Sequence, residues 1–229
     1  DPCLPTAFLS ATITVSRHRH GHADFFHAIK WGCNMRCVSL VLWAILFLLS
    51  DSHLLAEETN PLAVPRGLKP LKVPEDNPLT RAKVELGGQL FFDKRLSGDN
   101  TVSCASCHSP EKGWSNGQRF ATGVRGQQGG RSAPTIINSA YQYFQFWDGR
   151  AQQLEGQALG PIQNPIEMDM PIKQLVVKLN KIEGYRRQFQ QVFSTDVTSQ
   201  GIARAIASFE RTVLSGDAPI DRYKAGKKN

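Results

Sequence analysis

Cys104, Cys107 and His108 form the run Cys-x-x-Cys-His, and the chain after residue 56 contains no other cysteine and no other histidine. This run is typical of covalent haem attachment, in which the two thiols form thioethers with the haem vinyl groups and the adjacent imidazole binds the iron. A zinc site would need a further ligand of another type, and a redox dithiol or a disulfide would leave the histidine without a role. The motif therefore predicts one haem c, with His108 as the axial ligand of the iron.

The second axial position of such an iron separates an electron carrier from a catalyst. After the first 56 residues, the thioether side chains are those of Met168 and Met170. Either one would complete the His/Met ligation of a single-haem electron-transfer cytochrome, whereas packing in the hydrophobic core is the ordinary role of a methionine. The residues by themselves leave both functions open.

The elements that hold this motif are expected to be short helices. Helical spacing of apolar residues and helix-terminating residues predict helices at 78–92, 152–159, 171–179 and 202–213. Asn77 is the expected N-cap of the first helix, Thr198 that of the last, and Pro161 is expected to follow the end of the second. The period-2 alternation of strands is absent from the sequence. The predicted fold class is mainly α: a c-type cytochrome domain of short helices around one covalently bound haem.

The first 56 residues are expected to be a leader outside this fold. Residues 38–49 form an apolar run, interrupted by Ser39, which is preceded by Arg36 and followed by polar residues. A run of about twelve residues is too short for the roughly 30 Å hydrocarbon core of a bilayer. It indicates a signal peptide, with Met35 as the true start and cleavage near Ala56. The sequence therefore predicts a periplasmic protein with no membrane association after cleavage.

The rest of the chain is long enough for one domain with a sizeable core. Residues 57–77 are rich in proline and predict an extended arm. The formal net charge is +7, but the lysines and arginines are scattered and no nucleic-acid recognition motif is present. We therefore expect no nucleic-acid partner, and a basic surface suits an acidic redox partner instead.

A wider pattern surrounds the haem motif. Its runs are LGGQLFFDKRLSGDNTVSCASCH at 86–108, RSAPTIINSAY at 131–141, FWDGR at 146–150, QALGPIQNPIEM at 157–168 and FERTVLSGDAPIDRY at 209–223. Together they resemble the amino-terminal haem domain of the bacterial di-haem cytochrome c peroxidases, a family that includes MauG. The resemblance implies an oxidoreductase that reduces hydrogen peroxide to water with electrons from a small c-type cytochrome or a copper protein. MauG-like oxidation of a protein substrate is the alternative within the family.

The same resemblance assigns three residues to the peroxide side of the haem. Glu167 is expected to act as the acid or base that moves a proton between the peroxide oxygens. Gln157 is expected to hydrogen-bond the peroxide, and Pro161 to limit access above the iron. The ordinary alternatives are a solvated carboxylate, a solvated amide and a helix-terminating proline.

Three further residues are assigned to the haem periphery. Trp147 is expected to carry electrons between two haems, although a tryptophan at this place also suits the core. Arg131 and Arg150 are expected to pair with the haem propionates, since a planar guanidinium matches a carboxylate. Their alternative is ordinary surface charge.

The chain departs from the family pattern in three respects. The loop after the haem motif contains no histidine, so we expect the peroxide side of the iron to be open or closed only by water. Ser132 stands where family members have an asparagine that helps to bind calcium, which argues against calcium. The sequence reaches Asn229 without a second Cys-x-x-Cys-His. We therefore expect a haem domain at 78–215, the start of a connector at 216–229, and a second haem in a longer protein; a homodimer stays open.

Overall fold

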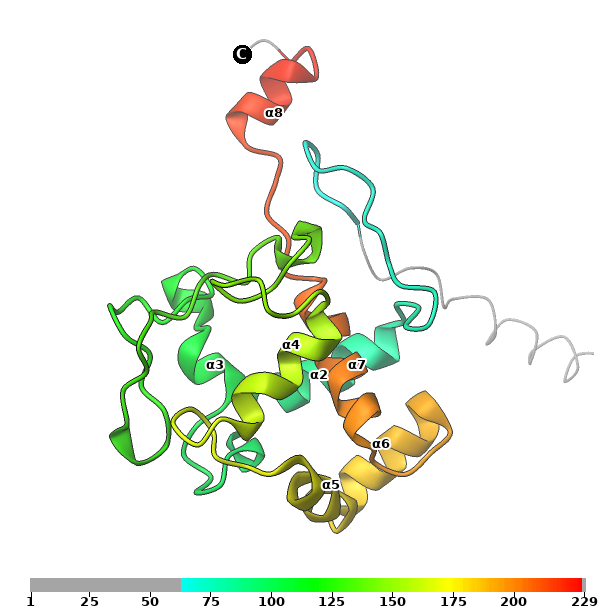
Figure 1. The fold of residues 1–229 in the computed structure, drawn as a ribbon. Coiled ribbons are helices and arrows are strands. Elements are labelled where there is room, and N and C mark those ends of the chain that lie inside the picture. Colours follow the sequence, from blue (N-terminus) through cyan, green and yellow to red (C-terminus); the bar gives the residue numbers. More distant parts are fainter. Residues whose placement is uncertain (1–62, 228–229) are drawn as a thin grey trace, which may run out of the picture. The chain divides into compact units, whose positions relative to one another are not determined.

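The computed structural model describes residues 63–227, all within the unit His53–Asn229. The expected leader, with its signal peptide and Met35, and residues 57–62 of the arm lie outside the described residues. The α-helices are α2 (Arg81–Phe92), α3 (Cys104–Cys107), α4 (Leu154–Gln163), α5 (Ile172–Asn180), α6 (Glu183–Phe193), α7 (Ser199–Glu210) and α8 (Pro219–Lys224) (Figure 1). The 3-10 turns are η1 (Lys94–Leu96), η2 (Pro110–Lys112), η3 (Val124–Gly126) and η4 (Ser139–Tyr141).

Helices and loops make up residues 63–227, with isolated β-bridges and no strand in that part of the chain. The predicted mainly α fold class is therefore confirmed. None of the helices in the described part of the chain has both the length and the apolar character needed to cross a bilayer.

Helices α2 and α7 pack against each other in the middle of the domain (Figure 1). Their apolar faces supply buried side chains at the predicted helical spacing, among them Leu86, Leu90, Ile202 and Ile206. Both helices begin at a threonine cap. The Thr198 side chain accepts from the Gly201 N–H at 3.0 Å, which confirms the expected cap of α7.

Three details of the helices differ from expectation. Helix α2 begins at Arg81, because Thr80 is its cap and the Asn77 side chain is used elsewhere. Helix α4 continues through Pro161 to Gln163, so the expectation that proline would follow the helix is wrong. The missing N–H removes a single bond, to the Gln157 carbonyl, close to the helix end. Helix α6 was not expected, although it buries Tyr185 and Phe189 four residues apart.

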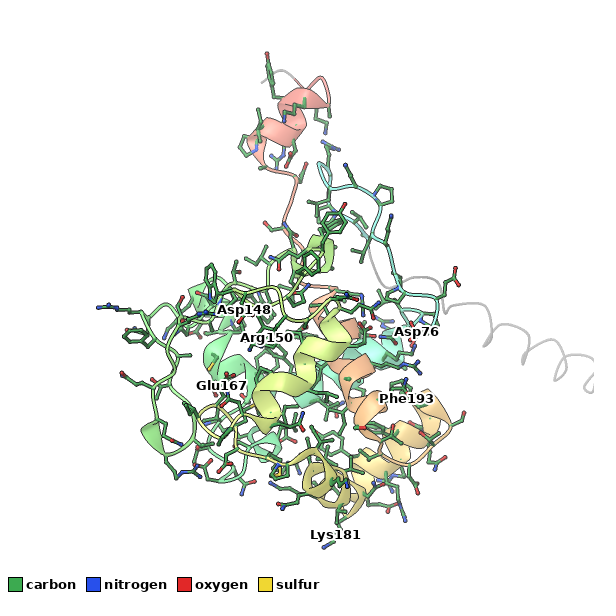
Figure 2. All side chains as sticks on the ribbon, viewed as in Figure 1. Asp76, Asp148, Arg150, Glu167, Lys181 and Phe193 are labelled. Atoms are coloured by element: carbon green, nitrogen blue, oxygen red, sulfur yellow. The ribbon has the colours of Figure 1, made fainter. Side chains whose placement is uncertain are left out.

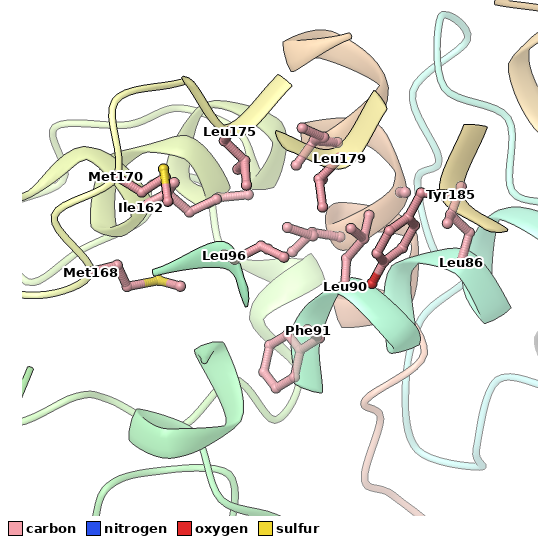
Figure 3. Packing of buried hydrophobic residues seen from close by; sticks show 14 of the residues in the cluster. Leu86, Leu90, Phe91, Leu96, Ile162, Met168, Met170, Leu175, Leu179 and Tyr185 are labelled. Carbon is pink, nitrogen blue, oxygen red and sulfur yellow. The ribbon is translucent and has the colours of Figure 1, made fainter. Parts of the chain in front are cut away.

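Met168 and Met170 lie in the hydrophobic core with 3% and 5% of their surface exposed (Figure 3). The same core cluster contains Leu96, Ile162 and Leu175. Burial among aliphatic side chains is the ordinary packing role of a methionine. It also fixes the segment between α4 and α5, which carries the predicted residue Glu167.

A buried polar network ties α4 to α7 and to the residues before α2. The Arg211 guanidinium donates to both Glu155 carboxylate oxygens at 2.7 and 2.9 Å. The Asn77 amide donates to Glu155 Oε1 at 2.7 Å, and Lys83 Nζ donates to Asn77 Oδ1 at 3.1 Å. Because buried charges are stable only when paired and hydrogen-bonded, this network sets the position of α4.

The described part of the arm, residues 63–77, contains turns but no helix. It contacts residues far along the chain, since Tyr141 Oη donates to the Lys69 carbonyl at 2.7 Å and the Asp217 N–H donates to the Arg66 carbonyl at 2.7 Å. The boundaries at 78 and 215 stay a prediction.

Candidate functional site

The haem motif is organised by the single turn of α3. Cys104 and Cys107 are its first and last residues, and the His108 N–H donates to the Cys104 carbonyl at 2.9 Å. At the start of the turn, the Ser103 N–H donates to Ser106 Oγ at 3.0 Å. One helical turn therefore brings two thiols and an imidazole to the same place.

The His108 ring is oriented by main-chain carbonyls. Its Nδ1 lies 3.0 Å from the Pro134 carbonyl oxygen and 3.3 Å from that of Trp114. A carbonyl only accepts hydrogen bonds, so Nδ1 carries the proton and Nε2 keeps its lone pair. Burial lowers the pKa of His108, while these two hydrogen bonds oppose that shift. A neutral imidazole with Nδ1 bonded to a carbonyl is the arrangement expected of a metal-binding histidine.

The two thiols suit covalent attachment of haem. Both are free cysteines. Burial raises the pKa of Cys104 and of Cys107, so both thiols are neutral. Two neutral, unpaired thiols one turn apart, next to an imidazole with a free Nε2, form the donor set that haem c requires. The side chains present therefore fit the cofactor.

Aromatic side chains from α2 and α7 pack next to the haem motif. The Phe91 ring lies 6.4 Å from that of His108, 6.0 Å from that of Trp114 and 5.0 Å from that of Phe209, between centroids. Such contacts are favourable beyond the burial of area. They connect the histidine directly to the packed pair α2 and α7.

Glu167 lies in the loop after α4. Asn164 Nδ2 donates to its Oε1 at 2.8 Å. Burial raises the pKa of Glu167, opposed by that hydrogen bond and by the charge of Arg150. After burial, the charge of Glu167 is the other cause that raises the pKa of Cys107. Figure 2 labels Glu167 together with Arg150, the cation that acts on it.

Gln157 and Pro161 both lie on α4, four residues apart. Residues at this spacing are neighbours on one helix face, so the structure brings these two predicted residues together. Both are partly buried. Because Pro161 has no N–H, the Gln157 carbonyl lacks the usual helical partner four residues later.

Trp147 is 62% exposed, and its Nε1 donates to the Ser132 carbonyl at 2.9 Å. Arg131 and Arg150 both bind Asp148, at 3.2 and 2.8 Å. The Arg150 guanidinium also lies 3.5 Å from the Phe146 ring centroid. Asp148 and Trp147 thus join two separate loop segments, around residues 131–132 and 146–150, and the pairing of the arginines with haem propionates stays a prediction.

Sequence reasoning missed four contributors to this site. Asp148 was recognisable in principle, since it stands between the tryptophan and arginine of FWDGR. Asn164 precedes Glu167 by three residues, a spacing that suits a side-chain hydrogen bond. The carbonyls of Trp114 and Pro134 carry no signal, because every residue type has a main-chain carbonyl.

The chain is similar in sequence to known proteins. The family model described as di-haem cytochrome c peroxidase matches residues 81–229. The methylamine utilization protein MauG of Methylophilus methylotrophus is 45% identical over 157 residues, which are 68% of this chain and 47% of that protein. The cytochrome c peroxidase Ccp of Escherichia coli K12 is 40% identical over 158 residues, which are 69% of this chain and 34% of that protein.

Solved structures are similar as well. A MauG-like protein associated with microbial copper homeostasis superposes with a TM-score of 0.68 at 34% identity, covering 75% of this chain and 51% of that chain. The diheme peroxidase BthA of Burkholderia thailandensis superposes with a TM-score of 0.53 at 25% identity, covering 59% of this chain and 39% of that chain. This chain therefore spans between 34% and 51% of the length of these relatives. With well over half of its residues matched by the family model, the chain belongs to the di-haem cytochrome c peroxidase family.

Proposed function

We propose that this chain forms the haem domain at which a periplasmic peroxidase reduces hydrogen peroxide to water. One observation carries the proposal: the Cys-x-x-Cys-His motif contains a neutral His108 with a free Nε2, and the charge of the partly buried Glu167 carboxyl acts on Cys107 of the same motif. An electron carrier needs the first group but has no use for the second. When bound, the haem supplies the iron and the electron transfer that peroxide reduction requires.

The proximal residues hold the cofactor. Cys104 and Cys107 form the two thioethers, and His108 Nε2 binds the iron while the carbonyls of Trp114 and Pro134 fix the ring. The preset ring orientation lowers the ordering cost of ligation.

The distal residues handle the proton. The Glu167 carboxylate takes a proton from one peroxide oxygen and delivers it to the other, so that cleavage of the oxygen–oxygen bond releases water. Burial raises the pKa of this carboxyl, which brings proton uptake and release closer to neutral pH. The Gln157 amide orients the peroxide, and the Pro161 ring restricts the space beside it.

Reduction of peroxide to two waters consumes two electrons and two protons. We place the second haem of the family in a part of the protein outside residues 1–229, and the electron path through Trp147. Arg131 and Arg150 bind the propionates in this proposal. The donor is a small c-type cytochrome or a copper protein. We include no calcium, because Ser132 stands where family members have the asparagine that helps to bind it.

The experiment is peroxide turnover by the haem-loaded, full-length protein with a reduced donor protein. Glu167→Gln is expected to lower kcat by about 10²–10⁴-fold, the usual contribution of a general acid–base group. Glu111→Gln is the matched control, since Glu111 is exposed near the same motif. A low-spin ferric haem that does not react with peroxide would instead support the electron carrier, with Met168 or Met170 as ligand.

A second candidate is oxidation of a protein substrate. Two relatives at 45% and 42% identity are named methylamine utilization protein MauG. The discriminating result is a peroxide-dependent change in the mass of a co-expressed protein, without consumption of reduced donor.

A further inference from the structure

We infer that Asn164 is a positioning residue that holds the Glu167 carboxylate in a single orientation toward the haem motif. The catalytic meaning of this inference rests on the proposed function. The geometry that supports it is independent of that function. Asn164 is the C-cap of α4, so it joins the helix that carries Gln157 to the loop that carries Glu167.

The main chain of Asn164 organises the whole turn. Its N–H donates to the carbonyls of Gly160 and Pro161 at 3.2 and 3.3 Å. Its carbonyl accepts from the N–H groups of Glu167, Met168 and Asp169 at 3.0, 3.1 and 2.9 Å. These bonds satisfy groups that a helix terminus leaves without partners. They persist with any side chain at position 164 that keeps the backbone conformation.

The side chain of Asn164 uses both ends of its amide. Oδ1 accepts from the Ile166 N–H at 3.0 Å, and Nδ2 donates to Glu167 Oε1 at 2.8 Å. The two partners also define the orientation of the amide, since an N–H requires an acceptor and an ionised carboxylate requires a donor. The Asn164 side chain therefore stabilises both the turn and the orientation of the Glu167 carboxylate.

The loop is braced independently of this amide. The Val124 N–H donates to the Glu167 carbonyl at 2.8 Å, and Gln127 Nε2 donates to the Pro165 carbonyl at 3.1 Å. A Cβ at Gly123 would overlap the Ile166 carbonyl, so η3 and the loop are in close contact. Loss of the Asn164 amide donor therefore frees the Glu167 side chain while the backbone stays in place.

The charged and polar groups around Glu167 determine its pKa. Arg150 is the cation that acts on it, and the charge of Glu167 in turn acts on the Cys107 thiol of α3. The Asp169 carboxylate, two residues later, is paired with Arg125 at 2.7 Å. A hydrogen bond from Asn164 favours the ionised carboxylate, whereas burial favours the neutral one. Without the amide donor, the effect of burial is opposed less strongly, so the pKa of Glu167 rises further.

Asn164→Asp keeps Oδ1 for the Ile166 N–H and replaces the donor with an oxygen. Its added negative charge raises the pKa of Glu167 in the same direction as the lost hydrogen bond, so the uncharged Asn164→Ser variant below separates the two effects. In the haem-loaded, full-length protein, the infrared carboxyl band that Glu167→Gln removes is titrated against pH. We expect Asn164→Asp to move this titration upward by about one pH unit or more. The acidic limb of kcat/KM is expected to move in the same direction.

Asn164→Ser is the second variant, since a hydroxyl still caps the turn but is too short to reach the carboxylate as the amide does. Gln163→Glu is the control, because it introduces a carboxyl at an exposed neighbouring position. A Glu167 titration unchanged in a folded Asn164→Asp or Asn164→Ser protein would overturn the inference. Failure of the proposed function would give a different result. Glu167→Gln would leave peroxide turnover intact, while the Asn164 variants would still shift the infrared titration of Glu167.

Discussion

Gly87 of α2 lies so close to Ala205 of α7 that a Cβ at position 87 would overlap the Ala205 carbonyl oxygen. Glycine at this point allows the two central helices to approach each other. Since α2 ends at Phe91 and Phe92, whose rings pack against those of His108 and Trp114, this approach also helps to place His108.

Gly87→Ala is expected to lower the free energy of unfolding by about 1–3 kcal/mol, the usual cost of overpacking. Gly156→Ala in α4 is the matched control, because a Cβ there meets nothing within 4 Å. The control is expected to stabilise the protein by about 0.5–1 kcal/mol, since alanine is the better helix former. Urea unfolding measures both, and equal effects of the two substitutions would contradict the close approach.

Arg211→Met is expected to destabilise the protein by about 3–5 kcal/mol, because it leaves the Glu155 carboxylate partly buried without its cation. The side chains of this pair are 5% and 16% exposed. Arg81→Met is the control, since Arg81 and Glu85 are 83% and 65% exposed and an exposed pair contributes little. The double variant Arg211→Met/Glu155→Leu should recover stability, and its failure to do so would show that the pair is not the source of the loss.

Glu210 gives the stability a pH dependence. Burial raises its pKa from 4.5 to about 8, opposed by the charge of Arg211 and assisted by that of Glu155. Between these two pH values the unfolded chain releases the proton that the folded chain keeps. The contribution of Glu210 to the free energy of unfolding is therefore complete below about pH 4.5 and is lost as pH rises to about 8.

Glu210→Gln should therefore flatten the fall in unfolding free energy between about pH 4.5 and 8, and stabilise the protein at the upper end. Each unit of pKa difference corresponds to about 1.4 kcal/mol. Glu75→Gln, at an exposed position, is the control. If the free energies of unfolding of the Glu210 variant and of the unsubstituted protein change with pH in parallel, a raised pKa of Glu210 is excluded.

Cys107→Ser is expected to leave the haem attached through Cys104 alone. One vinyl group then stays unsaturated, so the absorption band of the pyridine complex moves to longer wavelength. Cys104→Ser/Cys107→Ser should lose the haem on a denaturing gel, because only covalent attachment survives denaturation. Retention of haem by the double variant under denaturing conditions would show that these thiols are not the attachment points.

The haem motif and the helical faces of α2 and α7 were predictable, because both depend on residue type and on spacing along the chain. The path of the chain beyond them was less so. Pro161 was expected to end a helix, since the tendency of proline to break helices is local, but the structure loses only one hydrogen bond near the end of α4. The arrangement of Arg131 and Arg150 on Asp148 depends on a loop conformation, which composition does not define.

The histidine of the motif takes its orientation from main-chain atoms of residues 114 and 134. Replacing the side chain at either position leaves the oxygen that accepts from Nδ1, so no single point mutation deletes these acceptors. This hydrogen bond therefore depends on the path of the loop and not on the side chains at 114 and 134, although the Trp114 ring also packs against Phe91. An insertion or deletion between them, by contrast, would disturb the iron ligand at once.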